Sequence, residues 1–226
     1  MNQPRLPPTR LVRLHVVRRP VGRGRGHGGL PRPGQPGVGG HPPPRMSERL
    51  VVFDLDGTLI DSDAALVAPF VALGVDPATI TFGHVLADEC ARLGIDVDTY
   101  LDHYDPDLVE PFPGVTDLLE ELDRWVVCSN KHPQFGHAEL DRFGWAPELA
   151  LFSDAFDGPK RLGPILEWSG LTGAEIVFGG DTAHDRRCAN DVGALFGLAG
   201  WNPRSESAPG DVVLTRPIEV LALARA

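Results

Sequence analysis

Short apolar runs separated by amphipathic stretches make up most of this chain. The first run begins Val51-Val52-Phe53 and ends abruptly in charged and polar residues. Further strand-like runs lie at 125–129, 150–153, 176–179, 194–199 and 212–214, and helical patterns lie at 115–122, 134–143, 164–168, 185–191 and 217–224. This alternation predicts an α/β fold with a Rossmann-like core, a doubly wound parallel sheet that carries helices on both faces.

Residues 63–110 interrupt the alternation. They show helical patterns at 64–73, 78–93 and 97–104, and no convincing strand lies among them. An insertion directly after the first strand and its turn would lie above the carboxyl edge of the sheet. An ordinary extra helical hairpin is the alternative. We therefore expect an α/β core built from 46–62 and 111–226, with 63–110 as a helical insertion.

Two carboxylates, Asp54 and Asp56, directly follow the first apolar run and precede Gly57 and Thr58. A carboxylate at the end of a buried strand is costly unless a metal ion or hydrogen bonds compensate its charge. The carboxyl ends of the strands are also where open α/β sheets bind their ligands. The pattern therefore indicates a functional site, with an ordinary Asp-Gly turn as the alternative.

Further polar groups follow the later runs in a regular order. They are Ser129, Asn130 and Lys131 after the second run, Lys160 in a later turn, and Asp181 and Asp185 after the run at 176–179. Together with Asp54 and Asp56, these groups resemble the four motifs of the haloacid dehalogenase superfamily of phosphatases and phosphotransferases. The resemblance spans residues 50 to about 200. It implies that residues 63–110 form the small helical cap which that superfamily inserts over its active site.

The resemblance also implies catalytic roles. Asp54 is expected to be the nucleophile that forms an aspartyl-phosphate, which divides one difficult step into two easier ones. Asp56 is expected to protonate the leaving alkoxide and then to activate water, a general acid/base role worth roughly 10²–10⁴-fold. Relatives that dehalogenate or cleave phosphonates lack an acid at the second position. The presence of Asp56 therefore disfavours both of those activities.

The remaining motif residues are expected to bind the metal ion and the phosphate. By resemblance, Mg²⁺ is held by the Asp54 side chain, the Asp56 backbone carbonyl and Asp181, with Asp185 supporting it directly or through water. Mg²⁺ suits an all-oxygen site with few carboxylates. Ser129, Asn130 and Lys160 are expected to bind the phosphoryl group or to balance its charge.

Several of these residues have simpler interpretations. Asp185 could serve only as the cap of its helix, a role compatible with metal binding. Ser129 or Asn130 could be simple turn residues, and Lys131 is predicted to lie on the surface. His132 and His184 are more readily polar loop residues than substrate ligands.

The third motif is ambiguous by one residue. Lys160 is followed by Arg161, and the usual Lys-Pro-x-Pro pattern of the superfamily is absent. We favour Lys160, because the superfamily has an ammonium at this position and a guanidinium does not replace it in a tight site.

Composition changes the expectation for the first 45 residues. They hold nine of the 21 basic residues, ten prolines and nine glycines, but no acidic residue. Such a segment cannot bury enough apolar surface to fold. We expect either an upstream extension, with Met46 as the natural start, or a disordered arm. Residues 46–226 then carry 12 basic and 31 acidic residues, which argues against nucleic acid or an anionic membrane as a partner.

The cysteines and the length of the apolar runs bear on localisation. Cys90, Cys128 and Cys188 are widely spaced and form no metal-binding pattern, so buried thiols in a reducing cytoplasm are the preferred interpretation. No apolar run approaches the length of a membrane span.

The sequence as a whole predicts a cytoplasmic, Mg²⁺-dependent phosphatase that hydrolyses a small phosphomonoester. Ser129-Asn130-Lys131 and the small cap resemble the phosphoglycolate phosphatase-like subgroup in particular. A phosphomutase or phosphotransferase is the main alternative, and a non-catalytic binding protein on the same scaffold is a weaker one. The protein is expected to act as a monomer or a homodimer.

Overall fold

The computed structural model describes residues 48–226, and the predicted start at Met46 and the Arg-rich segment 1–45 lie outside these residues. The core is a six-stranded parallel sheet with the order β5-β4-β1-β6-β7-β8. Its strands are β1 (Leu50–Phe53), β4 (Trp125–Cys128), β5 (Leu149–Leu151), β6 (Ile176–Gly180), β7 (Leu195–Ala199) and β8 (Val212–Leu214). The predicted strands and the predicted doubly wound α/β fold are confirmed.

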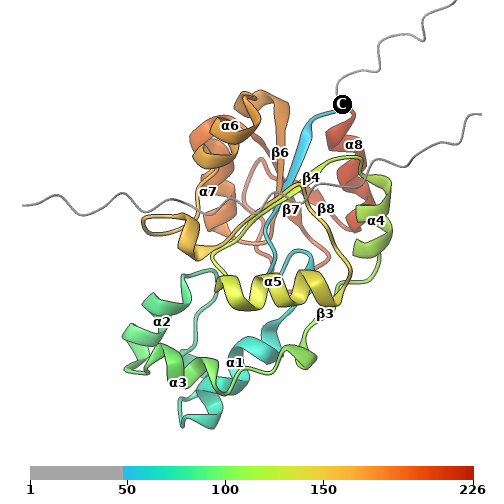
Figure 1. Cartoon of the computed structure of the whole chain (residues 1–226). Helices are drawn as coiled ribbons and strands as arrows, with labels where there is room; N and C mark the ends of the chain where they lie inside the picture. Colours follow the sequence, from blue (N-terminus) through green and yellow to red (C-terminus); the bar gives the residue numbers. More distant parts are fainter. Residues whose placement is uncertain (1–47) are drawn as a thin grey trace, which may run out of the picture.

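Helices cover both faces of this sheet (Figure 1). They are α4 (Val115–Glu121), α5 (Pro133–Arg142), α6 (Gly163–Ser169), α7 (Ala183–Val192) and α8 (Val220–Ala224), the last preceded by a 3₁₀ turn at Pro217–Glu219. Shorter 3₁₀ turns occupy Ser153–Ala155 and Gly173–Glu175. None of the helices within residues 48–226 is both long and apolar enough to cross a membrane.

Alternate side chains of β1 enter two separate hydrophobic clusters. Val51 and Phe53 pack on one face with residues of α4, α5 and α8, whereas Leu50 and Val52 pack on the other with residues of α6 and α7. All four side chains are almost fully buried. A strand that is apolar on both sides is typical of a parallel sheet covered twice, because each face must bury its own row of side chains.

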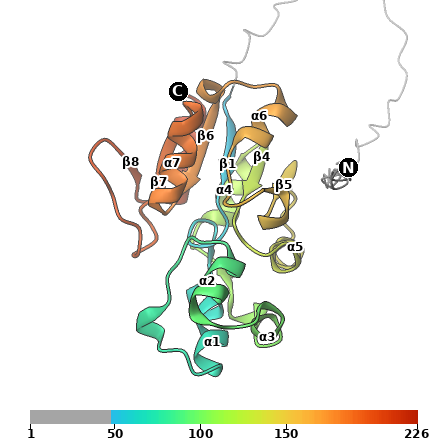
Figure 2. The same cartoon turned by 90° about the vertical axis from the view of Figure 1, so that its left-hand side faces the viewer.

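The segment after β1 leaves the sheet and returns to it through a small antiparallel pair. β2 (Ile60–Asp61) pairs with β3 (Glu110–Pro111), so Ile60 lies opposite Pro111. Between them lie α1 (Asp63–Ala72), α2 (Leu86–Leu93) and α3 (Val97–Leu101), with 3₁₀ turns at Pro77–Thr79 and Pro106–Leu108. Figures 1 and 2 show α1, α2 and α3 gathered beyond one end of the sheet. This end is the carboxyl end of β1, since β1 runs directly into the segment.

The helix predicted over 78–93 is wrong in its first half. Only Pro77–Thr79 and Leu86–Leu93 are helical, and residues 80–85 between them form a non-helical loop. Hydrogen bonds to residues outside the loop fix its conformation. The Thr81 N–H and hydroxyl donate to Glu89, and Asn130 Nδ2 donates to the Gly83 carbonyl (3.0 Å). Gly83 has a φ of +82°, which glycine adopts easily and which ends any helical continuation.

Gly180, the last residue of β6, permits a close approach that the site requires. A Cβ built on Gly180 would overlap the Cβ and Cγ of Asp185 in the first turn of α7. Asp185 cannot move aside easily, because it is fully buried and binds Lys160 and Thr182. The absence of a side chain at Gly180 therefore lets β6 and α7 bring Asp185 beside the other carboxylates.

We expect Gly180→Ala to lower the free energy of unfolding by about 1–3 kcal/mol, the usual cost of inserting a methyl group into a packed interior. Gly163→Ala is the matched control, because a Cβ at Gly163 meets nothing within 4 Å. Urea denaturation of the two variants measures the difference. Equal stabilities would show that Asp185 yields to the extra methyl group.

Candidate active site

Three buried carboxylates meet at the carboxyl ends of β1 and β6. Asp54 directly follows β1, Asp181 directly follows β6, and Asp185 lies in the first turn of α7. One oxygen from each lies within 4.8 Å of the others, and none of the three residues is more than 5% exposed. The sheet brings them together because β1 and β6 pair in parallel, with Phe53 opposite Gly179. The structure thus assembles three of the predicted metal ligands.

A turn at Gly57 shapes the side of this cluster. Gly57 has a φ of +76°, and a Cβ there would overlap the Asp181 carboxylate. Asn202, in the loop after β7, donates from Nδ2 both to the Gly57 carbonyl (2.9 Å) and to Asp181 Oδ2 (3.0 Å). Asn202 therefore fixes the turn and the carboxylate relative to each other.

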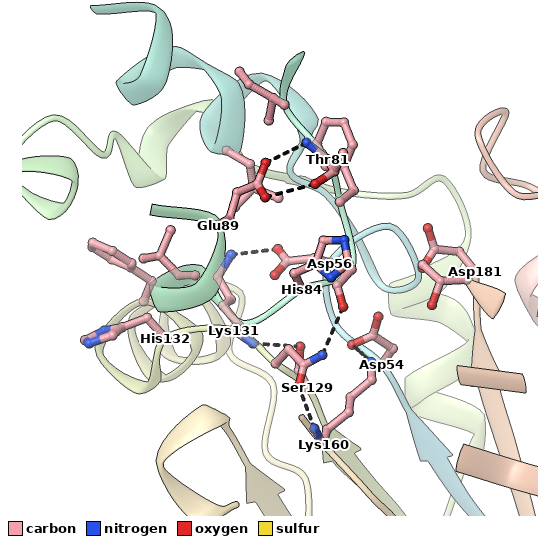
Figure 3. Close-up of a pocket in the computed structure, with 18 of the residues that line it drawn as sticks. Asp54, Asp56, Thr81, His84, Glu89, Ser129, Lys131, His132, Lys160 and Asp181 are labelled. Carbon is pink, nitrogen blue, oxygen red and sulfur yellow. Dashed lines mark hydrogen bonds and ion pairs between the residues drawn. The ribbon is translucent and has the colours of Figure 1, made fainter. Parts of the chain in front are cut away.

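Lys160 is the cation of this cluster. Its Nζ lies 2.7 Å from Asp54 Oδ1 and 2.6 Å from Asp185 Oδ1, and Figure 3 shows its side chain directed toward Asp54. Burial alone disfavours the ammonium, but Asp185 and Asp54 hold the pKa of Lys160 above its usual value. Arg161 is exposed. The geometry therefore assigns the ambiguous position to Lys160.

Asp185 also caps α7, as one of its sequence interpretations predicted. Its Oδ2 accepts hydrogen bonds from the Thr182 N–H (2.9 Å) and hydroxyl (2.6 Å), which forms a capping box. Burial opposes its negative charge, but Lys160 and Thr182 hold the pKa of Asp185 below its usual value. Since both oxygens are engaged, this arrangement favours support of a metal ion through water over direct ligation.

Ser129 and Asn130 line the same pocket from the end of β4. The Ser129 hydroxyl accepts a hydrogen bond from the Lys131 N–H (3.3 Å). The Asn130 amide bridges two segments, because its oxygen accepts from the Lys160 N–H (2.7 Å) while its nitrogen donates to the Gly83 carbonyl. Asn130 thus joins β4, the Lys160 turn and the inserted segment.

The prediction that Lys131 lies on the surface is wrong. Its side chain is only 3% exposed, and its Nζ lies 2.7 Å from Asp56 Oδ1, 3.1 Å from Glu139 Oε1 and 3.1 Å from the Tyr104 hydroxyl. The Tyr104 hydroxyl donates in turn to Glu139 Oε1 (2.7 Å). Figure 3 shows Lys131 reaching toward Asp56. A second ammonium, that of Lys131, therefore binds the Asp56 carboxylate. It belongs to a buried network that the sequence did not reveal.

Both the inserted segment and the core line the pocket that contains these groups. Its empty volume, which is open to solvent, is about 820 Å³. Asp54, Asp56, Lys160 and Asp181 lie on the core side, and His132 also lines the pocket. His184 is not part of the pocket lining, and its Nε2 lies 3.3 Å from the Lys160 carbonyl oxygen.

Comparison with known proteins finds relatives in sequence and in fold. No family model matches the chain. An N-acetylmuramic acid 6-phosphate phosphatase of Pseudomonas aeruginosa is 23% identical over 214 residues, covering 78% of this chain and 95% of that protein. A phosphoglycolate phosphatase of Pseudomonas fluorescens is 28% identical over 211 residues, with coverages of 75% and 78%. A haloacid dehalogenase-like hydrolase of Streptococcus pneumoniae shares the fold, with a TM-score of 0.61, 22% identity and coverages of 78% and 98%.

The chain is thus similar in sequence to curated phosphatases and has the fold of haloacid dehalogenase-like hydrolases. These similarities agree with the resemblance found in its four motifs. The relatives match most of their own length, so the similarity includes the inserted segment as well as the core.

The site also contains residues that the four motifs did not reveal. Asn202 follows β7 at the same edge of the sheet, so the strand-end argument that selected Asp54 and Asp181 would have selected it too. Glu139 lies four residues after Phe135 on the buried face of α5. A carboxylate at an apolar helix position is a signal for a buried partner, but nothing in the sequence identifies that partner as Lys131.

The donor set fits a divalent cation. When all three carboxylates are ionised, the one ammonium that the described residues bring between them is that of Lys160, so a divalent cation would neutralise the remaining negative charge. Burial, reinforced by Asp185 and opposed by Lys160, raises the pKa of Asp54 to about 6. Burial and the nearby Asp54 raise the pKa of Asp181 to about 8. Both pKa shifts reflect the free-energy cost of burying several negative charges close together.

Stability should therefore depend on pH in opposite ways with and without the metal ion. Between about pH 4 and 8 the folded, metal-free protein binds more protons at Asp181 than the unfolded chain does, so its free energy of unfolding falls as pH rises. Because metal ions bind the ionised carboxylates, stabilisation by Mg²⁺ should grow over the same window.

Melting temperatures between pH 5 and 8, measured in EDTA and in Mg²⁺, test this expectation. Asp181→Asn should flatten the EDTA profile relative to the unchanged chain and should abolish the stabilisation by Mg²⁺. A variant that follows the original profile in both buffers would contradict the assignment of Asp181.

The buried network around Lys131 should contribute more to the free energy of unfolding than an exposed ion pair does. Lys131→Met leaves the fully buried Glu139 without its cation, and breaking a buried pair in this way costs about 3–5 kcal/mol. The double variant Lys131→Met/Glu139→Leu should regain most of that loss, because it removes both charges.

Urea denaturation provides the measurement, and Arg124→Ala provides the control. Arg124 pairs with Glu148 on the surface, where such pairs contribute about 0–1 kcal/mol. If Lys131→Met were no more destabilising than Arg124→Ala, Lys131 would not stabilise the buried Glu139 carboxylate as described.

Proposed function

We propose that this protein is a Mg²⁺-dependent phosphatase that hydrolyses a small phosphomonoester through an aspartyl-phosphate at Asp54. The observation that carries the proposal is the cluster of Asp54, Asp181 and Asp185 around the single ammonium of Lys160. The curated relatives, which are named as phosphatases, support it. A phosphoryl group is already negative, so its transfer depends on neutralised charge and a positioned nucleophile.

The Asp54 side chain, the Asp56 backbone carbonyl and Asp181 would hold Mg²⁺, with Asp185 supporting them. All of these donors are oxygens, as Mg²⁺ requires, and the ion would neutralise charge on the phosphoryl oxygens. Lys160 orients Asp54 by binding its Oδ1, and Ser129 and Asn130 lie beside it to receive the phosphoryl group.

Asp54 attacks phosphorus, forming a new P–O bond as the bond between phosphorus and the ester oxygen breaks. Asp56 gives its proton to the departing alkoxide and later takes a proton from the water that hydrolyses the aspartyl-phosphate. Lys131 binds Asp56 Oδ1, which fixes the carboxyl group and leaves Oδ2 for this exchange. In this proposal Lys160 balances negative charge, and Asp56 transfers the protons.

We further propose that residues 63–110 act as a cap that covers the site and selects the substrate. This interpretation is supported by the inserted residues that line the pocket and by the hydrogen bond from Asn130 to Gly83. Cys90, Cys128 and Cys188 are buried free thiols, which supports a reducing compartment such as the cytoplasm. A small-molecule phosphate ester is the proposed partner, and a monomer or homodimer remains the prediction for oligomeric state.

Asp54→Asn should lower Mg²⁺-dependent phosphate release from a panel of phosphomonoesters by at least about 10³-fold, because an amide cannot act as the nucleophile. Asp141→Asn is the control, since Asp141 is exposed on α5. Both inorganic phosphate and newly phosphorylated alcohols are measured. Transfer to an alcohol without phosphate release would favour a phosphomutase or phosphotransferase, and full activity of Asp54→Asn would overturn the proposed nucleophile.

A further inference from the structure

Aromatic rings from the inserted segment and from α5 form part of the pocket lining. Phe70 packs on Tyr100 with ring centroids 4.6 Å apart, and Tyr104 stacks on Phe135 at 4.0 Å. The hydroxyls of both tyrosines are already engaged, since Tyr100 donates to the Leu66 carbonyl (2.9 Å) and Tyr104 to Glu139. This aromatic wall therefore presents carbon surface to a substrate, with its polar groups bound elsewhere.

The lysines and the arginine that line the pocket are each bound to carboxylates. Lys160 lies between Asp54 and Asp185, and the three hydrogens of the Lys131 ammonium face Asp56, Glu139 and the Tyr104 hydroxyl. Arg204 pairs with Asp63 and lies over the Phe82 ring, 4.1 Å from its centroid.

The two imidazoles on the pocket wall differ in position. Burial holds the pKa of the His132 imidazole below its usual value, and its Nδ1 is buried without a hydrogen-bond partner. His84 is exposed. Among the residues of 48–226 that line the pocket, His84 is therefore the exposed basic side chain that has no carboxylate partner.

A second anionic group on the substrate would meet an unfavourable environment at the aromatic wall. Asp56 and Glu139 place negative charge beside Tyr104, and Glu89, also on the pocket wall, is already bound by Arg92 and Thr81. A carboxylate placed beside Tyr104 would lose water, and the ammonium nearest to it, that of Lys131, is already bound to Asp56 and Glu139, so its burial is costly. The same wall suits an apolar or ring-shaped group, which gains free energy in proportion to the area buried.

We propose that the alcohol released by this enzyme is uncharged and carries a ring or another bulky carbon surface that packs against the aromatic wall. The inference rests on the proposed phosphatase function and narrows its substrate class to phosphomonoesters with no second anionic group. It separates this chain from its curated relatives, because phosphoglycolate and N-acetylmuramic acid 6-phosphate each carry a carboxylate.

Two pairs of esters that differ in one charge test the proposal on the full chain with Mg²⁺. They are benzyl phosphate against 4-carboxybenzyl phosphate, and 2-hydroxyethyl phosphate against phosphoglycolate. We expect kcat/KM to be at least about 10-fold higher for benzyl phosphate than for its carboxylate, and benzyl phosphate to exceed 2-hydroxyethyl phosphate. Equal or higher kcat/KM for the carboxylates would overturn the substrate class while leaving the phosphatase function intact.

Direct binding keeps the two proposals separable. Calorimetry with Asp54→Asn measures Kd for the same esters without turnover, and benzyl phosphate should bind at least about 10-fold more tightly than 4-carboxybenzyl phosphate. If no ester is hydrolysed by the unchanged chain, the phosphatase proposal fails, yet this difference in Kd still decides whether the pocket excludes a second anion.

A charge introduced into the pocket should reverse the preference. Leu66 lines the pocket from α1, whereas Val71 on the same helix is 47% exposed and is absent from the pocket wall. Leu66→Arg should raise the ratio of kcat/KM for 4-carboxybenzyl over benzyl phosphate by at least about 10-fold, and Val71→Arg should leave it unchanged. A carboxylate preference in the unchanged chain that Arg204→Ala or His84→Ala removes would overturn the proposal and identify that residue as the receptor.

Discussion

The arrangement of this protein depends on one electrostatic constraint, the burial of three carboxylates around one ammonium. Asp54, Asp181 and Asp185 meet at the ends of β1 and β6, and Lys160 binds the first and the third. Such a cluster is tolerable only where backbone geometry is exact and polar neighbours satisfy the remaining oxygens. Gly180 and Gly57 provide the close approach, and Thr182 and Asn202 provide the hydrogen bonds. The turn, the helix cap and the sheet register all serve to place these charges.

The same principle recurs in the network around Lys131, which connects the core with the inserted segment. Lys131 follows β4, Glu139 lies on α5, and Tyr104 belongs to the segment between β2 and β3. Because Lys131 also binds Asp56, the position of the inserted segment and the orientation of the proposed acid are linked through one ammonium. A displacement of Tyr104 would leave both Lys131 and Glu139 with an unsatisfied bond inside the protein, which is costly. The contacts that orient Asp56 therefore also favour this placement of the inserted segment.

Strands and strand-end carboxylates could be predicted because their signals are local. An apolar run followed by Asp54, and another followed by Asp181, need only a few neighbouring residues to be recognised. Lys131 was misassigned because its partners, Tyr104 and Glu139, lie 27 and 8 residues away in sequence and neither forms a motif. The helix at 78–93 was overextended for a related reason, since residues 80–85 are held by Glu89 and Asn130 rather than by their own preferences. Burial decided between Lys160 and Arg161, a property that sequence spacing does not contain.

In the proposed function, the reaction and the choice of substrate depend on different parts of the pocket, and the two parts follow different physical rules. The core side gathers charge, so its residues are constrained by electrostatics. The inserted side consists largely of rings and aliphatic groups, where the requirement is only to match the shape and polarity of the departing alcohol. The name of a relative's substrate therefore transfers less well than its chemistry. In the proposal made above, the choice among alcohols depends on the cations of that wall: Lys131 and Arg204 are bound in ion pairs, and His84 is the exposed basic side chain.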